Sequence, residues 1–215
     1  MSRFAPLLLV LALLAGCTGS PDTRGPFPAG NDLVGAAAST FAAVRSVHFV
    51  MGVNGVLPGF PLRQMEGDAT LDDGGYAKGT ADVQVGADHE KAGFVLRGDT
   101  VDGAKVPGEY TVGALLGPDA GLHRALLGVT DAETEGRESV EGIDSLRVAG
   151  RIPAAVAASV LPAIHDDVIV KVWVSVAEPR QFVRFWVQVP PAGPHLSPVM
   201  FELALTQPDV PVPVS

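Results

Sequence analysis

Residues 47–97 read VHFVMGVNGVLPGFPLRQMEGDATLDDGGYAKGTADVQVGADHEKAGFVLR, and this stretch decides the fold. Apolar and polar residues alternate within it in four segments, at 47–54, 62–72, 79–86 and 91–97. A period of two is typical of strands with one buried face, and Gly, Pro and Asp residues stand between the segments, where turns are needed. Strands joined by such short connections predict an antiparallel meander.

The rest of the chain extends this pattern and adds a few helices. Further strands are expected at 145–152, 168–176, 182–189 and 199–206. Helices are expected at 31–44 with Asn31 as N-cap, at 118–129 with Pro118 in the first turn, and at 153–161, where Pro162 ends the helix. A strand-rich chain with few helices predicts an α+β domain whose helices pack on one face of the sheet.

The N-terminus is expected to be a targeting segment that is removed from the mature protein. Residues 4–14 form an apolar run that is too short to span a bilayer of about 30 Å. The run ends in Leu14-Ala15-Gly16-Cys17, which resembles the bacterial lipobox. We therefore expect cleavage after residue 16, acylation of Cys17, and a protein held at the extracytoplasmic face of the cell membrane. The alternative is an ordinary signal peptide with a chance cysteine.

Composition limits the cysteine chemistry, the domain organisation and the class of partner to be expected. The single cysteine excludes an internal disulfide and a cysteine-based metal site. Residues 17–30 are expected to be the acylated cysteine and a flexible tether, 31–207 one domain, and 208–215 an extended Pro-rich tail. The formal net charge of −9 argues against nucleic acid as a partner.

Short motifs in a fixed order carry a family resemblance along most of the chain. They are the lipobox at Cys17, Ser46-Val47-His48, Val53-Asn54-Gly55, Pro58-Gly59, Gly67-Asp68, Lys78-Gly79-Thr80, Pro118-Asp119-Ala120-Gly121-Leu122, Glu135-Gly136-Arg137, the Gly142 turn, Leu146-Arg147-Val148-Ala149-Gly150 and Val172-Trp173-Val174. With these motifs the chain resembles the mycobacterial LppX/LprA/LprF/LprG lipoprotein family. It departs from the family at 100–116, which is shorter and lacks a tryptophan, and at Leu205-Thr206-Gln207-Pro208, where members often carry a Trp-containing strand end.

The resemblance implies a strongly curved antiparallel half-barrel sheet with helices over its concave face, enclosing an apolar cavity. It implies that this cavity holds the acyl chains of a lipid or acylated glycolipid, which the protein carries towards the outer envelope. No catalysis and no cofactor are implied, and an envelope transporter is a candidate partner.

Apolar faces of the expected strands are the candidate cavity lining, because a carrier needs apolar volume. The candidates are Phe49, Met51, Val53, Gly67, Ala81, Val83, Val85, Phe94, Leu96, Val172, Val174 and Phe185. Small residues such as Ala81 leave space, and Met51 can adapt to an irregular ligand. The alternative for all of these faces is an ordinary packed core.

Polar residues offer weaker candidates. His89-Glu90 lacks the second histidine of a zinc motif, and His165-Asp166-Asp167 is expected to be a polar connection. Two rival functions stay open beside the carrier. One is an envelope scaffold with a filled core that acts through a protein partner, and the other is an enzyme on lipids. A void of several hundred to a few thousand Å³ beneath the helices would favour the carrier over the scaffold.

Overall fold

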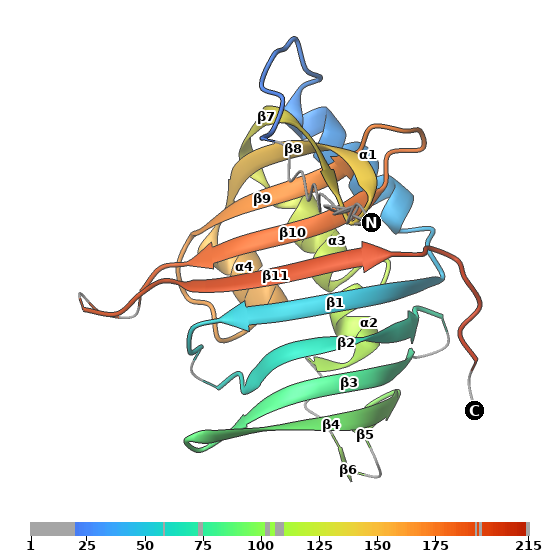
Figure 1. Ribbon diagram of the computed structural model, residues 1–215, viewed down its shortest axis with the longest axis vertical. Coiled ribbons are helices and arrows are strands. Elements are labelled where there is room, and N and C mark those ends of the chain that lie inside the picture. Colours follow the sequence, from blue (N-terminus) through green and yellow to red (C-terminus); the bar gives the residue numbers. More distant parts are fainter. Residues whose placement is uncertain are drawn as a thin grey trace, which may run out of the picture.

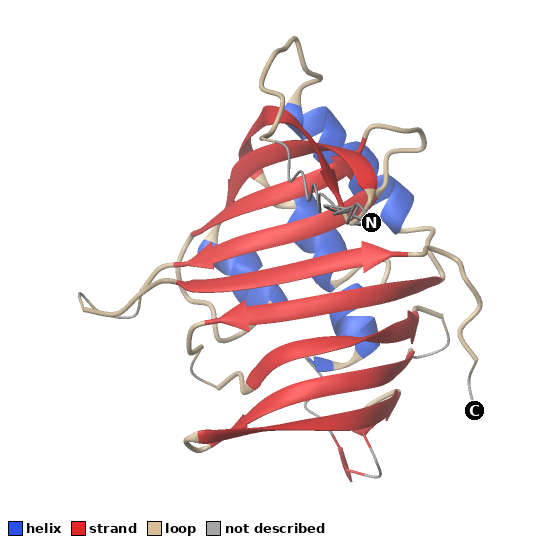
Figure 2. Ribbon diagram, in the orientation of Figure 1, coloured by secondary structure: helices blue, strands red, loops and turns tan. Residues whose placement is uncertain are grey.

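A computed structural model describes residues 20–213 except 58, 73–74, 102–103, 106–109, 192 and 194, and leaves the side chains of 85, 104 and 105 undescribed. The described chain forms one curved antiparallel sheet with its helices on the concave face (Figures 1 and 2). The predicted α+β class and unclosed half-barrel sheet are therefore confirmed. The predicted signal peptide and Cys17 lie outside the described residues.

The elements follow one another along the chain with short connections. The strands are β1 Ser46–Asn54, β2 Leu62–Thr70, β3 Tyr76–Val85, β4 Asp88–Arg97, β5 Thr100–Val101, β6 Ala104–Lys105, β7 Thr130–Val140, β8 Ile143–Ile152, β9 Val168–Ser175, β10 Phe182–Val189 and β11 Val199–Thr206. The helices are α1 Gly30–Phe41, α2 Val112–Leu116, α3 Gly121–Leu127 and α4 Ala154–Val160.

The sheet has the strand order β6-β5-β4-β3-β2-β1-β11-β10-β9-β8-β7, so the first and last strands meet at its centre. Phe49 of β1 stands opposite Leu205 of β11 on one side and Gly67 of β2 on the other. Two meanders, β1 to β6 and β7 to β11, are thereby joined into one sheet. We call β7 to β10 the packed half and β1 to β4 the hollow half, for reasons given below.

Helix α1 covers the packed half. Its buried residues are Leu33, Val34, Ala37, Ala38 and Phe41, and the Phe41 ring lies 6.4 Å from that of Phe182 in β10. Gly30 permits the close approach of the helix to the sheet, since a Cβ there would stand 2.5 Å from the Ala132 carbonyl oxygen. The apolar spacing of this segment predicted the helix correctly.

The sequence analysis was wrong about two of the three helix starts, those of α1 and α3. Ala29, not Asn31, is the N-cap of α1, and no side chain caps that helix. Pro118 lies ahead of α3, which begins at Gly121 after a turn in which the Ala120 amide donates to the Gly117 carbonyl.

Four elements were not predicted. Strand β7 (TDAETEGRESV) was not predicted because its many charged residues obscure the alternation of apolar and polar residues. Such a composition suits an edge strand. Helix α2 and the two-residue strands β5 and β6 fall in the segment that departs from the family pattern. Thr111 caps α2, because its hydroxyl accepts a hydrogen bond from the Ala114 amide.

Part of the predicted flexible tether lies against the edge of the packed half. The Asp22 amide donates to the Arg137 carbonyl, and the Asp22 carbonyl accepts from the Arg137 amide, each over 2.8 Å. The Thr134 hydroxyl donates to the Pro28 carbonyl. These contacts join the segment to β7 at Asp22 and at Pro28. No helix of the described residues is long and apolar enough to cross a bilayer.

Candidate functional site

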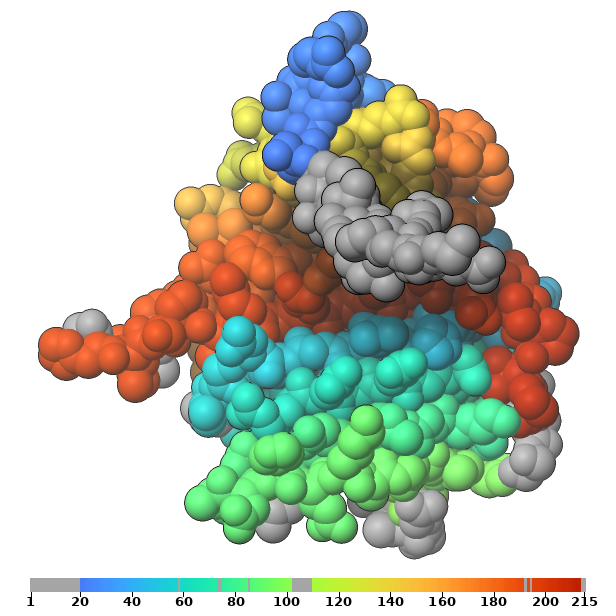
Figure 3. Space-filling model, in the orientation of Figure 1, coloured from blue at the N-terminus to red at the C-terminus, as the bar shows by residue number. Residues whose placement is uncertain are grey.

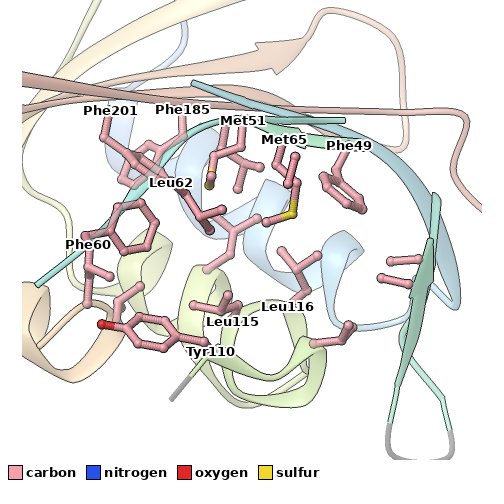
Figure 4. Close-up of a pocket in the computed structure, with 18 of the residues that line it drawn as sticks. Phe49, Met51, Phe60, Leu62, Met65, Tyr110, Leu115, Leu116, Phe185 and Phe201 are labelled. Carbon is pink, nitrogen blue, oxygen red and sulfur yellow. The ribbon is translucent and has the colours of Figure 1, made fainter. Parts of the chain in front are cut away.

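A cavity of about 460 Å³ lies between the concave face of the sheet and the helices, mainly under the hollow half but reaching β8 to β11 (Figure 4). The sheet lines it with Phe49, Met51, Leu62, Met65, Ala69, Ala77, Ala81, Val83, Ala92, Gly93, Phe94, Leu96, Val101, Ile152, Val168, Phe185, Val187, Phe201 and Leu203. Helices and connections line it with Phe60, Tyr110, Val112, Leu115, Leu116, Leu122, Ala125, Ala157, Val160, Leu161 and Ile164. Strand alternation explains the sheet side, because residues two apart share a face.

The cavity is closed at one end and open at the other. Ala69 and Ala77, beside the β2–β3 turn, are at most 3% exposed, so this end is closed. Leu62 and Val83 lie at the opposite ends of the same two strands and are half-exposed. Phe60 in the β1–β2 connection is half-exposed as well, and the lining residues Ala92 and Gly93 of β4 are exposed, so the cavity reaches solvent on this side, which we call the mouth.

The lining is almost entirely hydrocarbon. Tyr110 carries the one hydroxyl among the described lining side chains, and none of them is charged. Its ring lies 5.9 Å from that of Phe60, and Figure 4 shows the two together at one end of the cavity with Phe49 at the other. Such a cavity can take apolar chains, whereas a charged group inside it would lose its hydration without gaining a partner.

The structure brings seven of the predicted residues together around the cavity. They are Phe49, Met51, Ala81, Val83, Phe94, Leu96 and Phe185. Met51 stands opposite Met65 of β2, which in turn stands opposite Ala81 of β3, so two flexible side chains and a small one form a continuous row.

Four predicted residues do not line this cavity. Val172 and Val174 are fully buried in the packed half, because α1 fills the space above them. Val53 is 7% exposed and also belongs to the core. Gly67 faces Gly79 of β3 so closely that a Cβ on Gly67 would stand 2.1 Å from the Lys78 carbonyl oxygen. The side chain of Val85 and all of Cys17 lie outside the described part.

The sequence analysis missed most of the helix side of the cavity. Within the helix expected at 118–129, Leu122 lines the cavity, Leu126 is buried and Leu127 is 60% exposed. Leu115 and Leu116 belong to the unpredicted helix α2. The apolar residues Phe60 and Leu62 on either side of Pro61 were a usable signal that this connection also contributes to the lining.

The polar candidates lie apart from the cavity. His89 contacts Asp82 at 3.1 Å on the exposed β3–β4 hairpin, and within the described residues no group of three His, Cys, Asp or Glu side chains is placed to hold a metal ion. Trp173 packs with Val140 and Val183 in a small second cluster, where its indole N–H donates to Glu138.

Two shifted carboxyl groups lie at the β7 edge, far from the cavity lining. Hydrogen bonds from Arg24 lower the pKa of Asp22 to about 2. A hydrogen bond from Arg137 lowers the pKa of Asp144 below its ordinary value. Both pairs are exposed, so they report local contacts at the edge of the sheet and offer no catalytic arrangement.

Comparison with known proteins finds one family. Residues 29–212 match the family model described as LppX_LprAFG lipoprotein. The chain is 35% identical over 179 residues to the lipoarabinomannan carrier protein LprG of Mycolicibacterium smegmatis, covering 77% of this chain and 76% of that protein. It is 29% identical to the protein of the same name from Mycobacterium leprae, over 98% of this chain and 92% of the relative.

Solved structures share the fold. The crystal structure of LprF from Mycobacterium bovis matches with a TM-score of 0.71 at 21% identity, over 92% of this chain and 98% of that one. The crystal structure of the lipoprotein LppX from Mycobacterium tuberculosis matches with a TM-score of 0.67 at 19% identity, over 86% and 97%.

Proposed function

Because the chain belongs to the LppX_LprAFG lipoprotein family, we propose that it is a non-catalytic envelope lipoprotein that carries lipids or acylated glycolipids in its cavity. Its relatives named lipoarabinomannan carrier protein support a cargo of this class. We further propose that Cys17 carries the acyl anchor at the extracytoplasmic face, and that the cargo moves towards the outer envelope, with a transporter as partner.

The apolar cavity with one open end is the observation that carries this proposal. A filled core would have favoured a scaffold, whereas a void of about 460 Å³ lies in the range that small-molecule sites occupy. An enzyme on lipids needs a nucleophile beside a base, and Tyr110 is the one hydroxyl among the described lining side chains. The acyl chains would lie inside, and the headgroup would remain at the mouth in water.

The energetics suit transport. An acyl chain of about sixteen carbons leaving water for the cavity gains on the order of 10 kcal/mol, at about 0.8 kcal/mol per methylene. A membrane offers the same chain nearly the same apolar environment, so transfer between membrane and protein is close to neutral. A carrier needs this balance, because it must release its cargo as well as load it.

Native mass spectrometry of Ala81→Trp tests the proposal. Ala81 lies between Met65 of β2 and Ala92 of β4, so an indole there would fill the middle of the cavity. The chain from residue 17 on, with Cys17→Ser to remove the anchor, should co-purify with lipid from an envelope-containing host, and Ala81→Trp should not.

Thr80→Trp is the matched control, because Thr80 is the exposed neighbour on the opposite face of the same strand. It should retain the lipid. Equal loading of wild type and Ala81→Trp would remove the cavity assignment, and a lipid-free wild-type protein would remove the carrier function.

A further inference from the structure

The closed end of the cavity is made of buried and mostly small residues. Ala69 of β2, Ala77 of β3 and Leu96 of β4 stand opposite one another in one row across the three strands. They are 0%, 3% and 7% exposed, and all three line the cavity. We call this row the floor. Two of its three side chains are methyl groups, so the cavity keeps a depth that larger side chains would remove.

Helix α2 closes the space beyond the floor. Its first residue, Val112, is 5% exposed, and a Cβ on Gly75 would stand 2.6 Å from the Val112 Cβ. The residue that precedes β3 therefore lies directly against the helix. The Gly98 amide donates to the Gly75 carbonyl over 3.0 Å, which ties the chain after β4 to the same point. A chain that reaches the floor thus meets packed backbone and side chains beyond it.

The row next to the floor leaves a way to it. Phe49 of β1 and Phe94 of β4 line the cavity, and Gly67 and Gly79 stand between them across β2 and β3. Because glycine has no side chain, nothing projects from β2 and β3 between the two rings. A hydrocarbon chain can pass there, whereas a polar headgroup would lose its water without gaining a partner.

The polarity of the two ends decides which way a lipid lies. The mouth borders the exposed β3–β4 hairpin, which carries Asp88, Glu90 and Lys91. Tyr110 has the one hydroxyl among the described lining side chains, and it lies at the opposite end of the cavity from Phe49 (Figure 4). The floor side chains are hydrocarbon. A headgroup therefore stays at the mouth, and the terminal methyl group of the acyl chain points to the floor.

We propose that the floor selects the cargo by acyl-chain length, with Ala69, Ala77 and Leu96 setting the longest chain that fits. Along β3 the cavity runs from Val83 near the mouth to Ala77, which is about 20 Å at about 3.3 Å per residue. Within this depth each added methylene is buried and strengthens binding about fourfold. A methylene beyond it stays in water at the mouth and adds nothing. The proposal rests on the carrier function and adds a length preference to it.

A series of 1-acyl lysophosphatidylcholines with saturated chains of increasing length tests the proposal. Binding is measured by displacement of a fluorescent fatty acid, below the critical micelle concentration of each lysolipid. The delipidated chain from residue 17 on, with Cys17→Ser, contains every described helix and strand. Its affinity should rise about fourfold per methylene and then level off at one chain length, which we call the limiting length.

Floor variants should move the limiting length in opposite directions. Ala77→Leu adds three carbons to the floor and should shorten the limiting length by about three carbons, because the volume that they fill is lost to the chain. Leu96→Ala removes three carbons and should lengthen it by about as much. Ala77→Val adds two carbons and should shorten it by about two, which keeps the test open if the leucine is not tolerated.

Thr80→Leu is the matched control, because Thr80 is exposed on the outer face of β3. Figure 3 shows the sheet from this outer face, with the helices behind it. The enlargement is made on the same strand but outside the cavity. The limiting length should therefore stay where wild type has it.

Three results would overturn the proposal: a limiting length that no floor variant moves, one that Thr80→Leu moves as far as Ala77→Leu does, or floor variants that weaken every lysolipid by the same factor. The last result would show a general loss of binding without selection by length. A wild type that binds no lysolipid of any length would remove the carrier function itself, so the two proposals fail in different ways.

Discussion

The two halves of the sheet carry helices on the same face but differ in what fills the space beneath them. In the packed half, Val148 and Val172 are fully buried below α1. In the hollow half, the same face carries Ala77, Ala81 and Met51, and a cavity lies between them and the helices. The alternation of the strands is equal in both halves, so strand pattern alone does not make the void.

Helix length and side-chain size together make the difference. Helix α1 has 12 residues and covers four strands with one apolar face, whereas α2 above the hollow half has five. Alanines on β2 and β3 are too short to reach across to the helices, and Met51 and Met65 fill irregular space without closing it. A protein interior is normally close-packed, so a void of this size is a retained feature that function has to explain.

Truncating an aromatic ring should give the largest difference in the loss of stability between the two halves. Phe41→Ala removes a ring that is 4% exposed between α1 and β10, and should lower the free energy of unfolding by about 3–5 kcal/mol. Phe94→Ala removes a half-exposed ring beside an existing void and should cost less than about 1 kcal/mol. Urea denaturation of the lipid-free protein measures both. Equal losses would mean that the hollow half is packed in solution.

Adding cargo should protect the strands that line the cavity more than the edge strand β7, which contributes no lining residue. Binding to the folded state adds about 2.7 kcal/mol at a free ligand concentration one hundred times Kd. Hydrogen exchange of backbone amides should therefore slow in β3 and β4, which line the cavity, and stay unchanged for the amides of β7 at the far edge that exchange by local opening. Protection that appears first in β7 would place the ligand elsewhere.

The same enlargement should have unequal effects in the two halves. Ala37→Leu in α1 inserts a branched side chain where there is no exposed surface and should cost about 1–3 kcal/mol. Ala81→Leu points into the cavity and should change stability by less than about 0.5 kcal/mol. The thermal midpoints of the two variants, compared without lipid, check the difference. A comparable loss for Ala81→Leu would contradict a preformed void.

The sheet could be predicted from the sequence because alternation is a local signal. The eight strands expected from it are all present, and it assigned residues such as Phe49, Ala81 and Phe185 to the concave face. The same alternation also predicted Val172 and Val174 as cavity lining, but both are part of the packed core. The alternation of a strand indicates which face of the sheet a residue lies on. Whether that face becomes core or cavity depends on the helix that covers it, and the position of the helix depends on contacts between elements far apart in the sequence.

The misses have physical causes of their own. Strand β7 is an edge strand. Backbone pairing with its neighbour β8 holds it in the sheet, although many of its side chains are charged. Asn31 has the right chemistry for an N-cap, yet the helix begins earlier because Gly30 allows its close contact with Ala132. In both cases a contact distant in sequence overrides the local preference.

The smallest expected effect concerns the edge of the packed half, where Asp22 pairs with β7. Hydrogen bonds from Arg24 hold the pKa of Asp22 at about 2, below the ordinary 3.8. A lowered carboxyl pKa stabilises the folded state above pH 3.8, and this contribution is lost as the pH falls through 2. The pair is fully exposed, so salt should weaken it and the global midpoint should barely move.

An NMR titration of the Asp22 carboxyl should therefore give a midpoint near 2 that rises towards 3.8 in Arg24→Ala. The Arg137 amide, which donates to the Asp22 carbonyl, should exchange somewhat faster at the lowest pH than its intrinsic rate predicts. A wild-type midpoint near 3.8 would show that this contact does not form in solution. If both effects appear, pairing with β7 begins five residues after Cys17, which spans at most about 18 Å of extended chain, so the anchor proposed at Cys17 would hold the packed half near the membrane.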